Sequence, residues 1–423
     1  MDRRISQDLY SQSEKHTPGG VSSPVRSFAP FPVFMKKGKG AIITDADNNE
    51  YIDMCMAYGP LILGHANPKI SDAVKQQMEN GTVFGTPSEI ELRLLKNICS
   101  RVPCAESARL MNSGTEATMH AVRLARGFTG KNGIVMINGG FHGAHDALLA
   151  GISKDPFSPC VPWPEGVPED AVVNTFSIEY NDTEVLEQLL HRNKDIAAVI
   201  MEPIMGNRGV IPPKKGYLES VRKITSENDV VLIFDEVITG FRVAPDSAQG
   251  LYSVTPDLCT LGKIIGGGFP AGAVAGKKEI MNGFAPLGKV YQAGTFSGNP
   301  ITATAGSAAI EMLTTDVYRE LKKRTSTIVS ILNDSLSDAG VLGRVQSSNS
   351  MFQVFFGAES VECYGDSSKV DAIVYRDMFK HMLDAGIYLP PSAFEVNFLC
   401  TEHTDEQLLR IAEEFDRFVG GVQ

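Results

Sequence analysis

The sequence predicts an α/β fold built on a mostly parallel sheet, and three observations support this prediction. Short runs rich in valine and isoleucine recur along the chain, polar or glycine-containing segments bound each run, and stretches with helical spacing lie between them. Strands that are apolar on both faces and alternate with helices are typical of parallel sheets covered by helices. The apolar runs are GIVMI at 133–137, AAVIME at 197–202, VVLIFDE at 230–236 and LCTLG at 258–262, and the helical stretches are 115–127, 183–193 and 214–227.

The chain of 423 residues is longer than one ordinary domain. We predict a large domain over 61–300. After the S-G-N-P at 297–300 the pattern changes to one long helical stretch, alternating segments such as MFQVFF at 351–356, and further helices near 368–385 and 404–419. This pattern predicts a smaller α+β domain over 301–423, and residues 1–60, with their alternating strands, are predicted to pack with it.

Composition excludes several classes of function. Lys+Arg number 39 and Asp+Glu 50, so the formal net charge is −11, which argues against nucleic acid or an anionic membrane as the main partner. Seven scattered cysteines without a C-x-x-C pair indicate reduced thiols in a cytoplasmic protein rather than disulfides or a zinc site. We expect no signal peptide, no membrane-spanning segment and no bound metal.

Three local patterns carry chemistry, and each also has an ordinary structural explanation. In MNSGTEA at 111–117, Ser113 can cap a helix, Glu116 completes a capping box, and Gly114 allows a ligand close to the backbone. The free amides and positive dipole end of such a helix suit a phosphate. The alternative is an ordinary capped helix.

The second pattern is VVLIFDEVITGFR at 230–242, in which Asp235 stands at the end of an apolar strand. A carboxylate there needs a cation or a donor, and it can hold a heteroaromatic nitrogen in its protonated form. The alternative is an aspartate that only caps the following turn.

The third pattern is LGKIIGGGFPAGA at 261–273, where Lys263 stands among apolar and glycine residues. A lysine in such a loop is a candidate for a lowered pKa and Schiff-base chemistry, whereas the alternative is a surface lysine on a turn. Taken together, an anion site, a ring-nitrogen partner and a reactive amine are what pyridoxal phosphate requires of a protein.

These residues resemble the class III aminotransferases of fold type I, and within that class the glutamate-1-semialdehyde 2,1-aminomutases. The resemblance runs from GGVSSPVRSF at 19–28, through NSGTEA, DEVITGFR, LGKIIGGGFPAGA and AGTFSGNP at 293–300, to PSAFEVNF at 391–398. It implies a seven-stranded, mostly parallel sheet flanked by helices, and pyridoxal or pyridoxamine 5′-phosphate as the cofactor. It also implies a homodimer with shared active sites.

The resemblance further implies a role for individual positions. Lys263 would be the Schiff-base lysine and proton carrier, and Asp235 the partner of the pyridine nitrogen. The other cofactor-binding positions would be Ser113, Gly114 and Thr115 at the phosphate, Phe141 stacked on the ring, then His142, Glu202, Asn207 and Val237, with Thr295 reaching the phosphate of the other subunit.

On the substrate side, the resemblance points to Ser23, Val25, Arg26, Tyr58 and Glu395. Arg26 would bind the substrate carboxylate, and Glu395 would discourage common acceptors such as 2-oxoglutarate. Two departures from the family pattern bear on the substrate: Ala57-Tyr58 replace Ser-Trp, and 152–155 read ISKD where the gating loop usually reads AGSG. The irregular segment 156–168 is either a plain surface loop or a lid over the site, and the resemblance favours the lid.

The implied reaction is intramolecular amino transfer from (S)-4-amino-5-oxopentanoate to 5-aminolevulinate, a step of tetrapyrrole synthesis. Two other functions stay open at this point. One is an intermolecular class III aminotransferase acting on a β- or ω-amino acid, and the other is a pyridoxal-phosphate binder or racemase that no longer transfers nitrogen.

Overall fold

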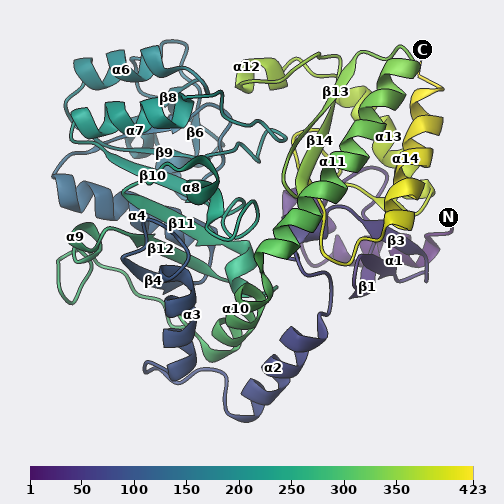
Figure 1. Cartoon of the computed structure of the whole chain (residues 1–423), viewed down its shortest axis with the longest axis horizontal. Coiled ribbons are helices and arrows are strands. Elements are labelled where there is room, and N and C mark those ends of the chain that lie inside the picture. Colours follow the sequence, from purple (N-terminus) through teal and green to yellow (C-terminus); the bar gives the residue numbers. More distant parts are fainter. Residues whose placement is uncertain (423) are drawn as a thin grey trace. The chain divides into compact units, whose positions relative to one another are not determined.

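The computed structural model describes residues 1–422, and its contacts divide the chain into two compact units (Figure 1). Unit 1 comprises residues 1–68, 319–361 and 366–422, and unit 2 comprises residues 69–318 and 362–365. The domain boundaries predicted from the sequence, after residue 60 and after residue 300, stay a prediction.

Unit 2 contains a seven-stranded sheet in the order β4-β12-β11-β10-β9-β5-β8. Its strands are β4 (Ser107–Met111), β5 (Gly133–Ile137), β8 (Thr175–Ile178), β9 (Ile196–Met201), β10 (Val231–Glu236), β11 (Leu258–Gly262) and β12 (Gly272–Gly276). Only β12 runs antiparallel to its two neighbours. The predicted fold class, a mostly parallel sheet flanked by helices, is therefore confirmed.

Helices of unit 2 follow the strands, and α4 packs against the central strands of the sheet. The helices are α2 (Pro68–Glu79), α3 (Glu89–Cys99), α4 (Gly114–Thr129), α5 (Glu169–Val172), α6 (Thr183–Arg192), α7 (Tyr217–Glu227), α8 (Ser247–Tyr252), α9 (Lys278–Met281) and α10 (Pro300–Met312). Two short strands, β6 (Ala150–Gly151) and β7 (Val161–Pro162), pair with each other. The core between α4 and the sheet is almost entirely aliphatic, with Ala117, Ala121, Ile134, Ile200 and Ile233 fully buried.

Unit 1 is a smaller α+β structure with two sheets, ordered β1-β2-β3-β15 and β13-β14-β16. Its strands are β1 (Met35–Lys39), β2 (Ile42–Asp45), β3 (Glu50–Asp53), β13 (Gly343–Ser348), β14 (Met351–Phe356), β15 (Ile387–Tyr388) and β16 (Asn397–Phe398). Its helices are α1 (Arg4–Ser13), α13 (Ala372–Asp384) and α14 (Asp405–Val419), and most of α11 (Thr315–Asp338) also belongs to it. A short helix, α12 (Tyr364–Ser367), lies where the chain passes between the units.

The prediction of a single long helix after residue 300 is wrong, because that stretch is interrupted. The chain forms two helices there, α10 and α11, because Leu313 leaves the helical conformation with φ −82° and ψ 87°. Asn299 caps α10 by accepting a hydrogen bond from the Thr302 amide at 2.9 Å. Among residues 1–422, no helix combines the length and the apolar character needed to cross a bilayer.

Candidate active site

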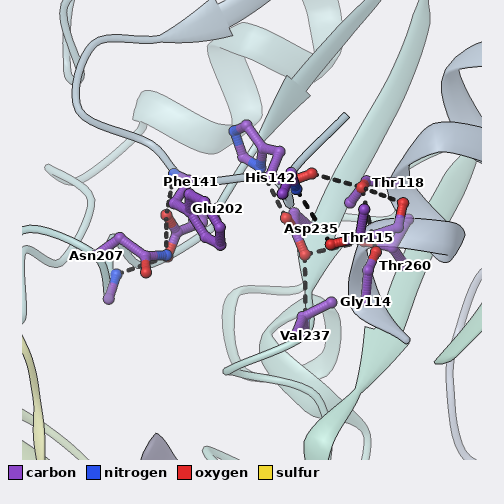
Figure 2. A network of polar contacts seen from close by, with 12 residues as sticks. Gly114, Thr115, Thr118, Phe141, His142, Glu202, Asn207, Asp235, Val237 and Thr260 are labelled. Atoms are coloured by element: carbon purple, nitrogen blue, oxygen red, sulfur yellow. Dashed lines mark hydrogen bonds and ion pairs between the residues drawn. The ribbon is translucent and has the colours of Figure 1, made fainter. Parts of the chain in front are cut away.

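Asp235 lies at the carboxyl end of β10, near the middle of the large sheet, and is 4% exposed. Its Oδ2 contacts His142 Nδ1 at 2.7 Å, and its Oδ1 accepts hydrogen bonds from Thr260 Oγ1 at 2.9 Å and the Val237 amide at 3.1 Å (Figure 2). A buried carboxylate needs such donors to stay ionised. The expected position of Asp235 at the end of its strand is confirmed. An aspartate that only capped the following turn would need the Val237 amide alone, whereas Asp235 also contacts His142 and Thr260.

His142 is also buried, and its Nδ1 donates to the carboxylate. Thr118 Oγ1 donates to the His142 carbonyl oxygen at 2.5 Å, which ties this loop to α4. The His142 Nε2 atom is buried without a hydrogen-bond partner among residues 1–422. An unpartnered buried nitrogen of this kind is expected where a bound group completes the site.

Lys263 follows β11 directly and begins the short 3₁₀ turn Lys263–Gly266. Its φ of +48° lies in the left-handed region, which is strained for a residue with a side chain. Because β10 and β11 are parallel, with Asp235 opposite Thr260 and Glu236 opposite Leu261, Lys263 leaves the sheet at the same edge as Asp235. The Lys263 side chain is half-buried, which differs from the alternative of an exposed surface lysine on a turn.

Helix α4 begins beside this edge, and Ser113 caps it by accepting a hydrogen bond from the Glu116 amide at 3.1 Å. The expected capping box is wrong in its second half. The Glu116 carboxylate accepts from the Asn112 amide at 2.9 Å instead of from the Ser113 amide. The amides of Gly114 and Thr115 lie in the first turn of α4, where backbone N–H groups have no acceptor within the helix. They can therefore donate hydrogen bonds to an anion bound at this helix end.

Gly114 sits tightly against the end of β10, since a Cβ placed on it would lie 3.1 Å from the Val237 methyl groups. Thr115 Oγ1 accepts from the Ala144 amide at 3.1 Å and holds the loop that carries His142. The sequence thus brings the helix start, Val237 and the His142 loop together around Asp235 (Figure 2).

Glu202 organises a second part of the site, next to Phe141 and Asn207 (Figure 2). It accepts hydrogen bonds from the Gly206 amide at 2.7 Å and Asn207 Nδ2 at 2.9 Å, and the Phe141 amide lies at 3.5 Å. Burial raises the pKa of the Glu202 carboxyl. Phe141 is 51% exposed, and its ring offers a flat surface for stacking.

All eleven predicted cofactor positions lie in unit 2, and Thr295 is exposed in the segment before α10. All five predicted substrate positions lie in unit 1. Within unit 1 they divide between two cavities: Arg26 and Tyr58 line one of about 580 Å³, and Val25 and Glu395 line another of about 300 Å³. Ser23 lines neither and begins the turn that holds Val25 and Arg26.

The Tyr58 backbone is strained, because Met56, Ala57 and Tyr58 all have positive φ, between 44° and 63°. The Tyr58 hydroxyl donates to the Val25 carbonyl at 2.6 Å and so fixes the turn before Arg26. Burial raises the pKa of Tyr58, nearby Glu395 raises it further, and Arg26 lowers it. Glu395 and Arg26 therefore act in opposite directions on the Tyr58 hydroxyl.

Sequence reasoning missed two residues at these places, Thr260 and Tyr388. Thr260 faces Asp235 only because of the strand register, and Tyr388 joins the larger cavity from β15. Neither stands in a recognisable motif. A group of three His, Cys, Asp or Glu side chains able to hold a metal does not occur within the described chain.

Comparison with known proteins identifies the family. The model of the class-III aminotransferases matches residues 24–415. The chain belongs to this family. A protein of Methanobrevibacter smithii named glutamate-1-semialdehyde 2,1-aminomutase is 49% identical over 413 residues, covering 97% of each chain.

Solved structures of other proteins share the fold. The ω-transaminase of Sphaerobacter thermophilus superposes with a TM-score of 0.92 at 31% identity, covering 98% of this chain and 97% of that one. The glutamate-1-semialdehyde aminomutase of Pseudomonas aeruginosa gives a TM-score of 0.90 at 25% identity, covering 99% and 94%.

Class-III aminotransferases depend on pyridoxal phosphate, and the residues of unit 2 fit this group. The helix start can take the phosphate, Asp235 offers a carboxylate to the ring nitrogen, the exposed Phe141 ring can stack on the pyridine, and Lys263 supplies the amine.

Proposed function

We propose that this chain transfers an amino group within one molecule and converts (S)-4-amino-5-oxopentanoate to 5-aminolevulinate. The observation that carries the proposal is the buried Asp235–His142 pair at the sheet edge where Lys263 begins its strained turn. The relative from Methanobrevibacter smithii, which is 49% identical and is named glutamate-1-semialdehyde 2,1-aminomutase, supports this reaction over the others known in the family.

When bound, pyridoxal phosphate or its pyridoxamine form supplies a carbonyl or amino group and a ring that accepts negative charge. Asp235 keeps the ring nitrogen protonated, and His142 and Thr260 hold that carboxylate in place. Lys263 would move a proton between the cofactor and substrate carbons, as general base and general acid. Ser113, Gly114 and Thr115 hold the phosphate, and Val237 and Asn207 line the ring.

In unit 1, Arg26 binds the substrate carboxylate through its guanidinium fork, and Ser23 and Val25 shape the turn that presents it. Tyr58 provides an aromatic wall. Glu395 repels the second carboxylate of 2-oxoglutarate and similar acceptors, which favours transfer within one molecule over transfer between two.

The proposal includes a homodimer in which Thr295 reaches the phosphate bound by the partner copy. The exposure around Thr295 supports this part: Leu287, Tyr291 and Phe296 are 78%, 71% and 57% exposed in the same segment. Exposed large apolar side chains gathered in one segment are typical of protein interfaces. Seven free cysteines agree with a reducing, cytoplasmic location.

The test supplies purified holoenzyme with the semialdehyde and no amino acceptor. We expect continued formation of 5-aminolevulinate, with many products per subunit, and no stimulation by added 2-oxoglutarate. A control reaction offers a β-amino or ω-amino acid together with a keto acid. Turnover only in that control would replace the proposal with an intermolecular aminotransferase.

A further inference from the structure

One strand of unit 1 carries a polar side chain that is completely buried. Strand β14 is apolar at every position except Gln353, which is 0% exposed. Burying an amide group is unfavourable unless its donors and its acceptor are paired. The hydrogen bonds of Gln353 therefore show which part of the chain this residue holds in place.

Gln353 connects β14 to residues 390–396, which we call the Glu395 loop. The Gln353 Nε2 atom donates to the Ala393 carbonyl oxygen at 2.7 Å. The Gln353 Oε1 atom accepts from Asn397 Nδ2 at 2.7 Å, and Asn397 is the buried first residue of β16. Gln353 thus binds the middle of the loop and also the strand that follows it.

Ala393 lies in the turn that carries Glu395. The Glu395 amide donates to the Ser392 carbonyl oxygen at 3.2 Å, and the Phe394 amide donates to Ser392 Oγ at 3.2 Å. Ala393 and Phe394 are therefore the central residues of the turn. Because Gln353 belongs to a strand in the core of unit 1, its hydrogen bond to Ala393 restricts where the turn places the Glu395 carboxylate.

Tyr375, on α13, holds the start of the same loop. Its hydroxyl donates to the Pro390 carbonyl oxygen at 3.0 Å, and the residue is buried. Hydrogen bonds of buried donors are strengthened by the low dielectric of the interior. Two buried side chains, one from a helix and one from a strand, therefore anchor the Glu395 loop.

We propose that Gln353 and Tyr375 are positioning residues, which hold the Glu395 carboxylate where it repels the second carboxylate of acceptors such as 2-oxoglutarate. The inference rests on the proposed function of Glu395 and adds the buried residues on which that function depends. Every contact that carries the inference lies within unit 1. Displacing a negative charge weakens its repulsion without abolishing it, so loss of either anchor relaxes the selectivity in part.

The experiment follows the half-reaction between the pyridoxamine form of the holoenzyme and 2-oxoglutarate, by stopped-flow absorbance of the cofactor. The cofactor gives its amino group to the keto acid, which becomes glutamate, and receives the keto oxygen to become the pyridoxal form. We expect the rate constant to rise about tenfold in Glu395→Gln, where the repelling charge is lost. It should rise about threefold in Gln353→Met and in Tyr375→Phe, where the charge is kept but displaced.

Gln346→Met is the matched control. Gln346 lies opposite Gln353 on the neighbouring strand β13, and its amide group hydrogen-bonds Val361, which lies outside the Glu395 loop. Its rate constant should equal that of the original enzyme. A double variant separates positioning from a general loss of stability: in the Glu395→Gln background, Gln353→Met should add nothing, because no charge is left to displace.

An unchanged rate constant in both Gln353→Met and Tyr375→Phe would overturn the inference. An equal rise in Gln346→Met, a full further rise in the double variant, or no rise in Glu395→Gln would do the same. If Gln353→Met does not fold, Tyr375→Phe, which keeps the aromatic ring and its packing, decides the question. Conversion of the semialdehyde without an acceptor tests the proposed function separately, so either proposal can fail while the other stands.

Discussion

At the scale of single residues, the account depends on how Asp235 is held. Three donors surround its two oxygens, and each comes from a different part of unit 2: the His142 loop, β11 and the turn after β10. Such an arrangement fixes the carboxylate before any ligand arrives. Preorganised charge of this kind is a large contributor to catalysis in buried sites.

We expect Asp235→Asn to lower turnover of the semialdehyde at least a hundredfold, because a neutral amide does not stabilise a protonated ring nitrogen. The amide has nearly the same shape, so the thermal unfolding midpoint and the amount of bound cofactor should change little. Steady-state kinetics, with cofactor content measured on the same sample, check this. Turnover within tenfold of the original enzyme would show that Asp235 does not have this role.

At the scale of elements, helix α10 supports the turn that carries Lys263. Gly306 on α10 lies so close to this turn that an added Cβ would stand 1.9 Å from the Ile265 carbonyl oxygen. The neighbouring Gly267, with φ +57°, approaches the Ala305 carbonyl in the same way, at 2.3 Å. Two glycines therefore allow helix and turn to touch through their backbones.

We expect Gly306→Ala to push the turn away from the helix, lowering turnover at least tenfold and destabilising unit 2 by about 1–3 kcal/mol, as overpacking does. Kinetics and thermal unfolding of the purified variant measure both effects. Gly365→Ala is the control, since its added methyl group would meet only the Cys363 sulfur, at 3.7 Å. If the two variants behaved alike, close packing at Gly306 would not be what places Lys263.

At the scale of the whole molecule, one buried histidine, His403, contributes to the stability of unit 1 against acid. His403 Nδ1 accepts from the Cys400 amide at 3.0 Å, and its Nε2 donates to the Asp53 carbonyl at 3.1 Å, so the ring is held neutral. Burial lowers the pKa of His403 to about 4, and nearby Asp53 only partly opposes this.

Because unfolded His403 binds a proton near pH 6.5 and folded His403 does not, its contribution to the stability of unit 1 is fully present above about pH 6.5 and is lost as the pH drops toward 4. The loss attributable to this residue is about 3 kcal/mol. Proteolysis of unit 1 between pH 7.5 and 4.5 measures it. His403→Gln should flatten the pH dependence, and an unchanged slope would mean that another group is responsible.

Much of the large sheet could be predicted from the sequence, because β5 and β11 match their apolar runs and β9 and β10 differ by a residue or so. Strands β4, β8 and β12 escaped prediction because their side chains are small, polar or mixed, as in GAVAG. These strands are positioned by pairing with neighbouring strands of the sheet, and such pairing leaves no local pattern in the sequence. The same reason explains why Thr260 was missed.

The motifs that contain Ser113, Asp235 and Lys263 lie at one edge of the large sheet, where strand and helix ends meet, and the position of each along its strand or helix could be predicted from the sequence. The substrate side was harder to predict. Arg26, Tyr58 and Glu395 come from three distant segments of unit 1, and only the fold shows that Arg26 and Tyr58 line one cavity and Glu395 another.

The central claim, that Lys263 is the amine joined to the cofactor, can be tested by mass spectrometry. The holoenzyme is reduced with borohydride and digested, and the peptide that carries the pyridoxyl group is identified. The account predicts the label on Lys263, with none on Lys277 or Lys278 a short distance along the chain, and no label in Lys263→Ala. A label on another lysine, or cofactor that is released unbound from the reduced protein, would contradict it.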